Sequence, residues 1–178
     1  SSVLLGCDKL EVTVKDSTWK LTTANTMSID KDGKITINPI EILNKNQKIN
    51  IAGKFSSIPG DSMLIKTSGV VLEQFNPLLN LIKLDLSGVL NGNIVLSNAN
   101  KNFAFRGDLN LKQLKINDNV VGELSVNTAY NTNEKYISLN GFTSLGLQDE
   151  FGNQVKNISF NGNYYLDKRE ETIDINFS

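Results

Sequence analysis

The residue types that most often perform catalysis are scarce in this chain of 178 residues. Histidine is absent, which removes the commonest general base, the Ser-His and Cys-His arrangements and most zinc sites. The single cysteine, Cys7, has no activating neighbour in the sequence. Two pairs of adjacent carboxylates, Asp149 with Glu150 and Glu170 with Glu171, lie in turn-like stretches where a solvated surface is the ordinary outcome. The sequence therefore predicts neither an enzyme nor a cofactor-binding protein.

Two short motifs are similar to ligand-binding loops but are incomplete. The run "DKDGK" at 30–34 hints at a calcium loop. Such a loop needs a carboxylate or amide at position 28, which is Ser28, and a glutamate at position 39, which is Pro39. The run "GVLNG" at 88–92 lacks the Lys-Ser/Thr ending and the following helix of a phosphate loop. We expect a hairpin turn at 30–34, a strand through 88–92 and no metal site.

Charge and hydropathy narrow the range of partners. The net charge is -1 and the sequence pI is about 5.5, so the chain has no basic surface for nucleic acid. Hydrophobic residues make up 39%, which is enough to bury a core. No apolar run approaches the roughly 18 residues that span a bilayer, and the mean hydropathy is -0.20. We therefore expect a soluble segment whose membrane anchor, if there is one, lies outside it.

The beginning of the chain, "SSVLLGCDKL", leaves two interpretations of Cys7 open. Residues 4–7 resemble the end of a bacterial lipoprotein signal, in which a lipid is attached to the cysteine, but the basic and apolar regions of such a signal are not seen before them. The alternative is that Cys7 is a small buried hydrophobe. A single cysteine also excludes an internal disulfide.

Apolar and polar residues alternate along almost the whole chain, which is typical of β-strands with one buried face. About a dozen strands are expected, more than the five or six of an ordinary sheet. In one clear stretch the apolar face carries Phe103, Phe105, Gly107, Leu109 and Leu111, and the opposite face carries Arg106, Asp108, Asn110 and Lys112. The next stretch places Val120, Gly122, Leu124 and Val126 together on the apolar face.

One short helix is expected near residues 77–83, in "LEQFNPLLNLIK". Asn76 can cap it and Pro77 suits its first position. We interpret it as a plug over the open end of a sheet rather than as a membrane-surface helix, because the segment has little basic character.

Glycine repeatedly interrupts the apolar faces of these strands. A strand glycine marks a bend, a bulge or a close approach, so the sheet is expected to curl toward its apolar side. The predicted fold is one all-β domain over 1–178, a single wide, curled antiparallel sheet that forms a U-shaped trough with an apolar interior. From the pattern alone, a closed sandwich with a dry core stays open as the alternative. The glycines expected to face the trough are Gly53, Gly88, Gly92, Gly107, Gly122, Gly141 and Gly162.

A trough of this kind would be lined by the large apolar residues of the middle and C-terminal strands. These candidates are Leu84, Leu86, Leu90, Ile94, Leu96, Phe103, Phe105, Leu109, Leu111, Leu124, Val126, Ile158 and Phe160.

Five phrases of the sequence resemble the C-terminal region of the TamB translocation and assembly module family, within the AsmA-like group of bridge-like lipid-transfer proteins. They are "STWKLTTANTMSID", "QKINIAGKFS", "LEQFNPLLNLIKLDLSGVLNGNIVLS", "FRGDLNLKQLKINDNVVGELSV" and "LQDEFGNQVKNISFNGNYYLD". The phrases occur in the family's order and cover most of the chain, and the third and fourth are the most specific.

The resemblance implies a fragment of a long periplasmic protein of a Gram-negative bacterium, anchored to the inner membrane and engaging a TamA-type outer-membrane barrel. It also implies the trough called a β-taco, whose ligands are phospholipid acyl chains. The family is linked to phospholipid transport to the outer membrane and to the assembly of outer-membrane proteins such as autotransporters. Acyl chains need a continuous apolar lining, which the alternation supplies.

Two other classes of function remain open from the sequence. One is a lipoprotein-like β-sandwich that binds glycan or protein, which would require exposed aromatic residues on the polar face, where Tyr165 is nearly the only candidate. The other is a structural spacer whose sheet is closed and empty.

Overall fold

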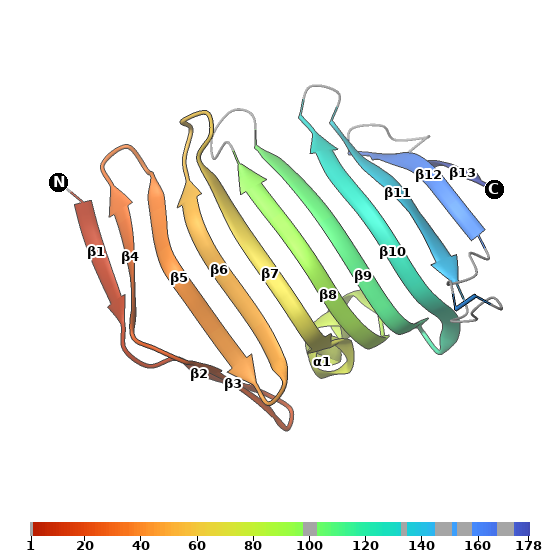
Figure 1. Ribbon diagram of the computed structural model, residues 1–178, viewed down its shortest axis with the longest axis horizontal. Coiled ribbons are helices and arrows are strands. Elements are labelled where there is room, and N and C mark those ends of the chain that lie inside the picture. Colours follow the sequence, from red (N-terminus) through yellow and green to blue (C-terminus); the bar gives the residue numbers. More distant parts are fainter. Residues whose placement is uncertain (1, 98–102, 133–134, 145–150, 153–157, 167–172) are drawn as a thin grey trace.

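The computed structural model describes residues 2–97, 103–132, 135–144, 151–152, 158–166 and 173–178. In these ranges the chain forms one antiparallel sheet of 13 strands and one short helical segment (Figure 1). The first seven strands are β1 (Ser2–Cys7), β2 (Glu11–Val14), β3 (Ser17–Leu21), β4 (Asn25–Asp30), β5 (Ile35–Asn44), β6 (Gln47–Phe55) and β7 (Ser62–Val71). The others are β8 (Leu86–Ser97), β9 (Ala104–Ile116), β10 (Asn119–Asn131), β11 (Tyr136–Ser144), β12 (Ile158–Tyr165) and β13 (Ile173–Phe177).

The sheet is a meander in which strands pair with their neighbours in the sequence. From β5 to β13 the order in the sheet is the order in the chain. Before β5, β1 pairs with β4 and β2 pairs with β3, so these four strands are the two halves of one long bent hairpin. Strand β5 pairs with β4 along its first half and with β3 along its second half. The predicted all-β fold with a single wide antiparallel sheet is confirmed.

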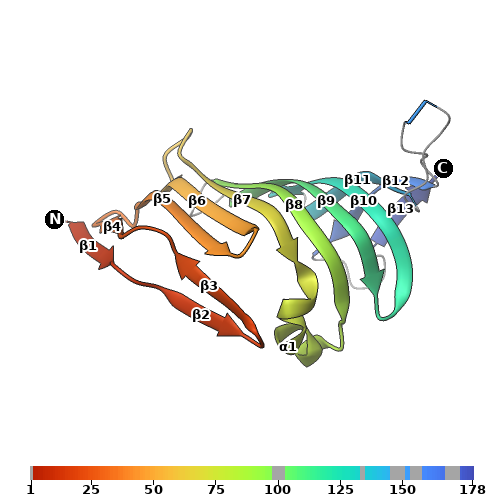
Figure 2. The same cartoon turned by 60° about the horizontal axis from the view of Figure 1, so that its bottom comes forward.

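A line of irregularities crosses the sheet and bends it. The register shifts on β5–β6, β7–β8, β8–β9 and β9–β10, at Ile37/Ile40, Thr67/Val70, Ser87/Val89 and on both sides of Gly122. Such bulges bend a strand and increase its twist. Figure 2 shows the consequence, because strands β8 to β10 curve toward the side on which α1 and the β2–β3 hairpin lie. The sheet is therefore a curled trough rather than a flat surface.

The trough is open. The edge strands β1 and β13 each have one neighbour among the described residues, and they do not pair with each other. Five hydrophobic side chains of the described ranges are buried, namely Trp19, Met63, Val70, Leu72 and Leu114. A closed sandwich, which the sequence left open as an alternative, would bury many more, and it is not the fold of this chain.

The helical segment connects β7 to β8 and begins earlier than the sequence predicts. It consists of the 3-10 turn η1 (Leu72–Phe75), the single α-helical turn α1 (Asn76–Leu79) and the 3-10 turn η2 (Asn80–Ile82). The expected cap at Asn76 is wrong, since its side chain makes no capping hydrogen bond. Its amide donates to the Asp85 carboxylate, and its oxygen accepts a 3.0 Å hydrogen bond from the Leu86 N–H. Asn76 therefore ties the segment to the start of β8.

Candidate functional site: the apolar face of the trough

The antiparallel register places apolar side chains of neighbouring strands side by side on one face. Partners directly opposite each other point to the same side of a sheet, so continuous rows can be followed from strand to strand. One row from β6 to β13 is Ile51, Ile65, Ile94, Gly107, Thr128, Leu139, Gly162 and Ile175. The adjacent row is Ile49, Thr67, Gly92, Leu109, Val126, Gly141, Phe160 and Phe177.

Most of the predicted lining residues lie in these and the flanking rows. They are Leu90, Ile94, Leu96, Phe105, Leu109, Leu111, Leu124, Val126, Ile158 and Phe160. Leu86 is on β8 beyond the bend and pairs with Ile116. Leu84 and Phe103 lie just outside β8 and β9, and Phe103 joins the apolar face through a ring contact with Phe105 at 6.4 Å.

One expected face assignment is wrong. Val120 pairs with Lys115, and its side chain is 65% exposed on the face opposite to the apolar rows. The register shift between Val120 and Gly122 causes the difference, since one extra residue in a strand reverses the direction of every side chain before it.

Strand β7 also contributes to this face, although none of its residues is predicted from the sequence to line it. Met63, Ile65 and Val70 extend the apolar rows. The alternation in "MLIKT" is a visible signal for the first two. Val70 follows a register shift, so simple alternation from Met63 places it on the wrong face.

The apolar face is uncharged and half-exposed. In the paired rows of the described strands it carries no Asp, Glu, Lys or Arg. Most of its side chains are neither buried nor fully exposed. The sheet path contains eleven strands, and ten spacings of about 4.8 Å give the face a width of roughly 48 Å. A long, continuous apolar surface thus stays partly open to solvent.

The glycines of the apolar face allow neighbouring strands to approach each other closely, and they do not leave free space. A Cβ on Gly92 would lie 2.3 Å from the Asp108 carbonyl oxygen and 2.9 Å from Leu109 Cδ2. A Cβ on Gly53 would lie 2.3 Å from the Ser62 carbonyl oxygen. Of the predicted glycines, Gly53, Gly92, Gly107, Gly122, Gly141 and Gly162 pair within the apolar rows, and Gly88 lies at a register shift. Neighbouring atoms fill the space beside these glycines, so Gly92 leaves no room for a ligand.

Aromatic rings gather at one end of the trough. Phe103 contacts Phe55 at 6.2 Å and Tyr130 at 6.2 Å, and Phe105 stacks on Tyr130 with an angle of 15° between the rings. These residues come from the end of β6, the start of β9 and the end of β10, which meet at the same edge. The rings form an apolar rim opposite the end that holds the helical segment.

The helical segment occupies the other end through a network of neutral polar groups. The buried Gln74 accepts hydrogen bonds from Trp19 Nε1 at 3.1 Å and from Asn44 Nδ2 at 3.3 Å. Its own amide donates to Gln47 Oε1 and to the Val71 carbonyl oxygen, both at 2.6 Å. These contacts agree with the interpretation of the segment as a plug. The outer side of the segment exposes Leu78 and Leu81.

The alternatives based on catalytic or metal-binding residues gain no support from the described residues. Asp30 uses its carboxylate to accept the N–H groups of Asp32 and Lys34, each at 2.9 Å, as expected for a hairpin turn. No cluster of three His, Cys, Asp or Glu that could hold a metal occurs in the described ranges. Cys7 is a free thiol on β1. The carboxylate pairs at 149–150 and 170–171 lie outside the described residues.

The loop between β6 and β7 is fixed by one carboxylate. Asp61 accepts a hydrogen bond from the Ser56 hydroxyl at 2.7 Å and pairs with Lys34 Nζ at 3.0 Å. The Ser56 hydrogen bond, followed by the interaction with Lys34, lowers the pKa of Asp61 below its ordinary value. Asp61 therefore stays ionised and holds this loop against the β4–β5 turn.

Comparison of the chain with family models, with curated proteins and with solved structures gives no significant match. In the described ranges, no helix has both the length and the apolar character that crossing a membrane requires. Any assignment of function must therefore be argued from the trough itself and from the phrases of the sequence.

Proposed function

We propose that this chain is a periplasmic segment of a TamB-like protein of outer-membrane biogenesis, and that its trough accommodates phospholipid acyl chains. The observation that carries the proposal is the uncharged apolar face, which runs through every strand of the sheet path and is not covered by a second sheet. Burial of a methylene group contributes about 0.8 kcal/mol, so an acyl chain on this face would be held without any specific polar contact.

The geometry supports a conduit better than an enclosed binding pocket. The rows run across the strands, so a chain that lies along them meets Ile, Leu, Val and Phe side chains from strand to strand without a charged residue. A charged head group has no partner on this face and would stay in solvent, because an unpaired buried charge is costly. The plug at one end and the aromatic rim at the other leave the direction along the rows as the open path.

The resemblance to the TamB family supports the cellular role, in which the full-length protein is anchored to the inner membrane and engages a TamA-type barrel. In this role the trough serves phospholipid transfer, the assembly of outer-membrane proteins, or both. The lipoprotein-like sandwich and the closed spacer lose their structural basis, because the sheet is single and open.

A pair of crosslinking variants tests the trough directly. A benzophenone amino acid is placed at Ile94, which faces the trough between Ile65 and Gly107, or at Val95, which faces the other side between Leu64 and Arg106. After irradiation in cells, we expect phospholipid adducts at position 94 and none above background at position 95, measured by mass spectrometry. Equal labelling of the two positions, or none at position 94, would contradict the proposal.

A further inference from the structure

The face opposite the trough carries a row of amide side chains. This outer row crosses β6 to β13 and consists of Asn50, Lys66, Asn93, Asp108, Asn127, Asn140, Asn161 and Asn176. Asparagine is depleted in strands, so its repetition at the same level of successive strands needs a reason. Amide ladders can stabilise stacked strands through their own hydrogen bonds. Within the described part of the chain, however, the side chains of Asn93, Asn127 and Asn140 make no hydrogen bond.

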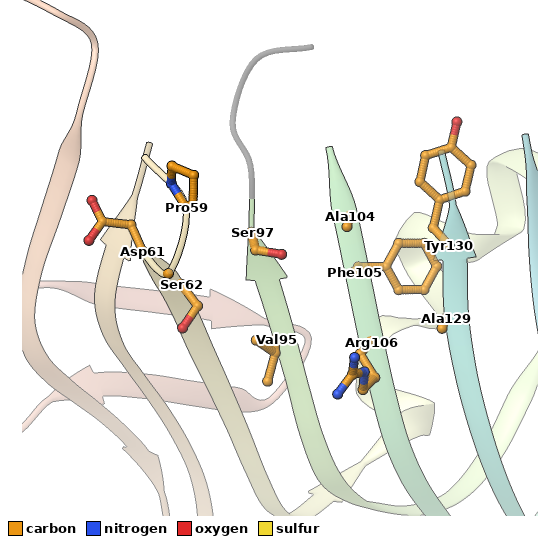
Figure 3. Close-up of a pocket in the computed structure, with 11 residues that line it drawn as sticks. Pro59, Asp61, Ser62, Val95, Ser97, Ala104, Phe105, Arg106, Ala129 and Tyr130 are labelled. Atoms are coloured by element: carbon orange, nitrogen blue, oxygen red, sulfur yellow. The ribbon is translucent and has the colours of Figure 1, made fainter. Parts of the chain in front are cut away.

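A groove runs beside this row of amides. A hollow of about 460 Å³ lies over β7 to β10 and a second of about 480 Å³ lies over β8 to β11. The two hollows share Val95, Arg106 and Ala129, which sit at one level of the sheet, so they adjoin and together make one groove. Figure 3 shows the residues that line the first hollow. Four spacings of about 4.8 Å give it a length of roughly 19 Å. Many of the residues that line the groove are small, including Ser62, Ser97, Ala104, Ala129 and Ser138.

A ligand in this groove would be recognised by side chains alone. The groove crosses the middle of the sheet, where the backbone N–H and C=O groups of β8, β9 and β10 are paired with each other. An added β-strand is therefore excluded as the mode of binding. One wall presents the amides of Asn93, Asn127 and Asn140, each able to donate and to accept hydrogen bonds.

Three charged groups line the groove. Asp61 is held in its ion pair with Lys34, and the other two are of opposite sign and are both available. Arg106 and Asp108 are exposed and form no ion pair within the described residues. Because their charges offset each other, the groove does not select a polyanion. A guanidinium and a carboxylate beside a line of amides offer donors and acceptors to a neutral, hydroxyl-rich ligand.

We propose that this outer groove binds a neutral polysaccharide chain that carries hydroxyl and acetamido groups. Sugar hydroxyls donate and accept hydrogen bonds as amides do, and the C–H faces of a sugar can rest on Val95 and Ala129. Aromatic side chains occur on the same face near the groove, since Tyr136 and Tyr165 pair at 5.6 Å in a T-shaped contact. The groove lies on the face opposite the trough, although Phe105 and Tyr130 of the aromatic rim also border its first hollow.

Titration with the β-1,4-linked tetramer of N-acetylglucosamine tests this groove. We expect the tetramer to shift the side-chain NMR signals of Asn127, Asn140 and Arg106 in the isotopically labelled chain. Substitution Ala129→Trp fills the groove and Asn127→Leu removes a donor and an acceptor from its wall. Each variant should weaken binding about tenfold or more in calorimetry, which corresponds to about 1.4 kcal/mol.

Asn161→Leu is the matched control, because Asn161 lies in the same row, is exposed like Asn127 and does not line the groove. It should leave the affinity for the tetramer unchanged, and circular dichroism should show that all three variants are folded. The proposal is overturned if the tetramer shifts no groove signal at millimolar concentration, or if Asn161→Leu weakens binding as much as Asn127→Leu. It is also overturned if dextran sulfate binds in a salt-dependent way while the tetramer does not, or if the groove binds a protein and not the tetramer.

Discussion

Gly92 shows why a strand can need glycine on a face that is otherwise made of large apolar residues. Its φ angle is +151°, and the chain of β9 passes so close that a methyl group would meet the Asp108 carbonyl oxygen. Leu109 then covers the position that a side chain at 92 would have occupied. The glycine therefore allows two strands of a strongly curled sheet to approach each other.

Gly92→Ala should destabilise the sheet by about 3 kcal/mol, because the new methyl group can be accommodated only by moving the backbone of β9. Urea unfolding followed by circular dichroism measures the loss. Gly6→Ala is the control, since a Cβ at Gly6 would meet no atom within 4 Å, and it should change the free energy of unfolding by less than about 0.5 kcal/mol. Equal stability of the two variants would show that the strands separate easily at Gly92.

Side-chain direction was predictable for single residues wherever a strand is regular. Phe105 and Arg106 lie on opposite faces, as alternation predicts. The prediction is wrong at Val120 because Gly122 signals an irregularity but does not tell on which side of it, or in which strand, the register shifts. In β9 the residue at the irregular position is Gln113, which has a φ of +54°. This left-handed conformation is uncommon for glutamine, so the residue type does not predict it.

Among the elements, the segment from η1 to η2 depends most on a specific polar contact. Gln74 lies between β3, β5 and β6 and satisfies donors from Trp19 and Asn44. The ring of Trp19 also contacts Phe75, with 6.3 Å between the centroids. The β2–β3 hairpin and the helical segment are thus held together by one neutral side chain and one aromatic contact.

Gln74→Leu should weaken the contact between the helical segment and the β2–β3 hairpin at this end of the trough. The Trp19 Nε1–H group would lose its acceptor, and leaving a buried donor unsatisfied costs about 1–3 kcal/mol. Trp19 is the only tryptophan, so its fluorescence reports on this contact alone, and we expect its emission to shift to longer wavelength. Glu73→Leu, one residue away at an exposed position, should leave the emission unchanged. An unshifted spectrum for Gln74→Leu would show that the plug does not depend on this contact.

The existence of the helical segment was predictable from Pro77, which suits the first position of a helix. Its true beginning at Leu72 was not, because "LEQF" has no signal that separates a 3-10 turn from the end of a strand. The partners of Gln74 were also beyond sequence reasoning. Trp19 is 55 residues away in the chain, and only the pairing of β3 with β5 brings it near.

Because the trough is open, a charged side chain introduced on its apolar face should not prevent folding. Leu90 lies on the apolar face between Val70 and Leu111, and Val89 lies on the opposite face between Val71 and Lys112. In an open trough the long side chain of arginine can extend to solvent, whereas in a closed core the charge would be trapped. We expect Leu90→Arg to stay folded but to lose phospholipid crosslinking from position 94, because it places a charge in the path of the acyl chains.

Val89→Arg is the matched change on the outer face and should keep both folding and crosslinking. Thermal melting by circular dichroism and crosslinking yield are measured together for the two variants. A folded Leu90→Arg variant that crosslinks phospholipid as well as the unchanged chain would argue against the conduit. Loss of folding in Leu90→Arg alone would mean that the face is buried in solution.

The single curled sheet was predictable because the glycines fall on the apolar side of their strands. That argument could not separate an open trough from a closed one, since the same alternation serves both. Two observations distinguish the open trough from a closed one: the register shifts along the sheet, and the absence of pairing between the edge strands β1 and β13 within the described residues. Both depend on strand pairing over the whole sheet. The apolar lining was therefore largely predictable, whereas its solvent exposure was not.

The meander order of the strands has a consequence for how the molecule forms and fails. Each strand from β6 onward pairs only with the strands just before and just after it in the chain, so the pairing contacts are local. Folding can then propagate from hairpin to hairpin, and cooperativity passes only between neighbours, as in a linear array of repeats. Unfolding should start at the two edge strands and move inward. A destabilising substitution in a central strand such as β8 would separate two cooperative blocks of strands that otherwise unfold together.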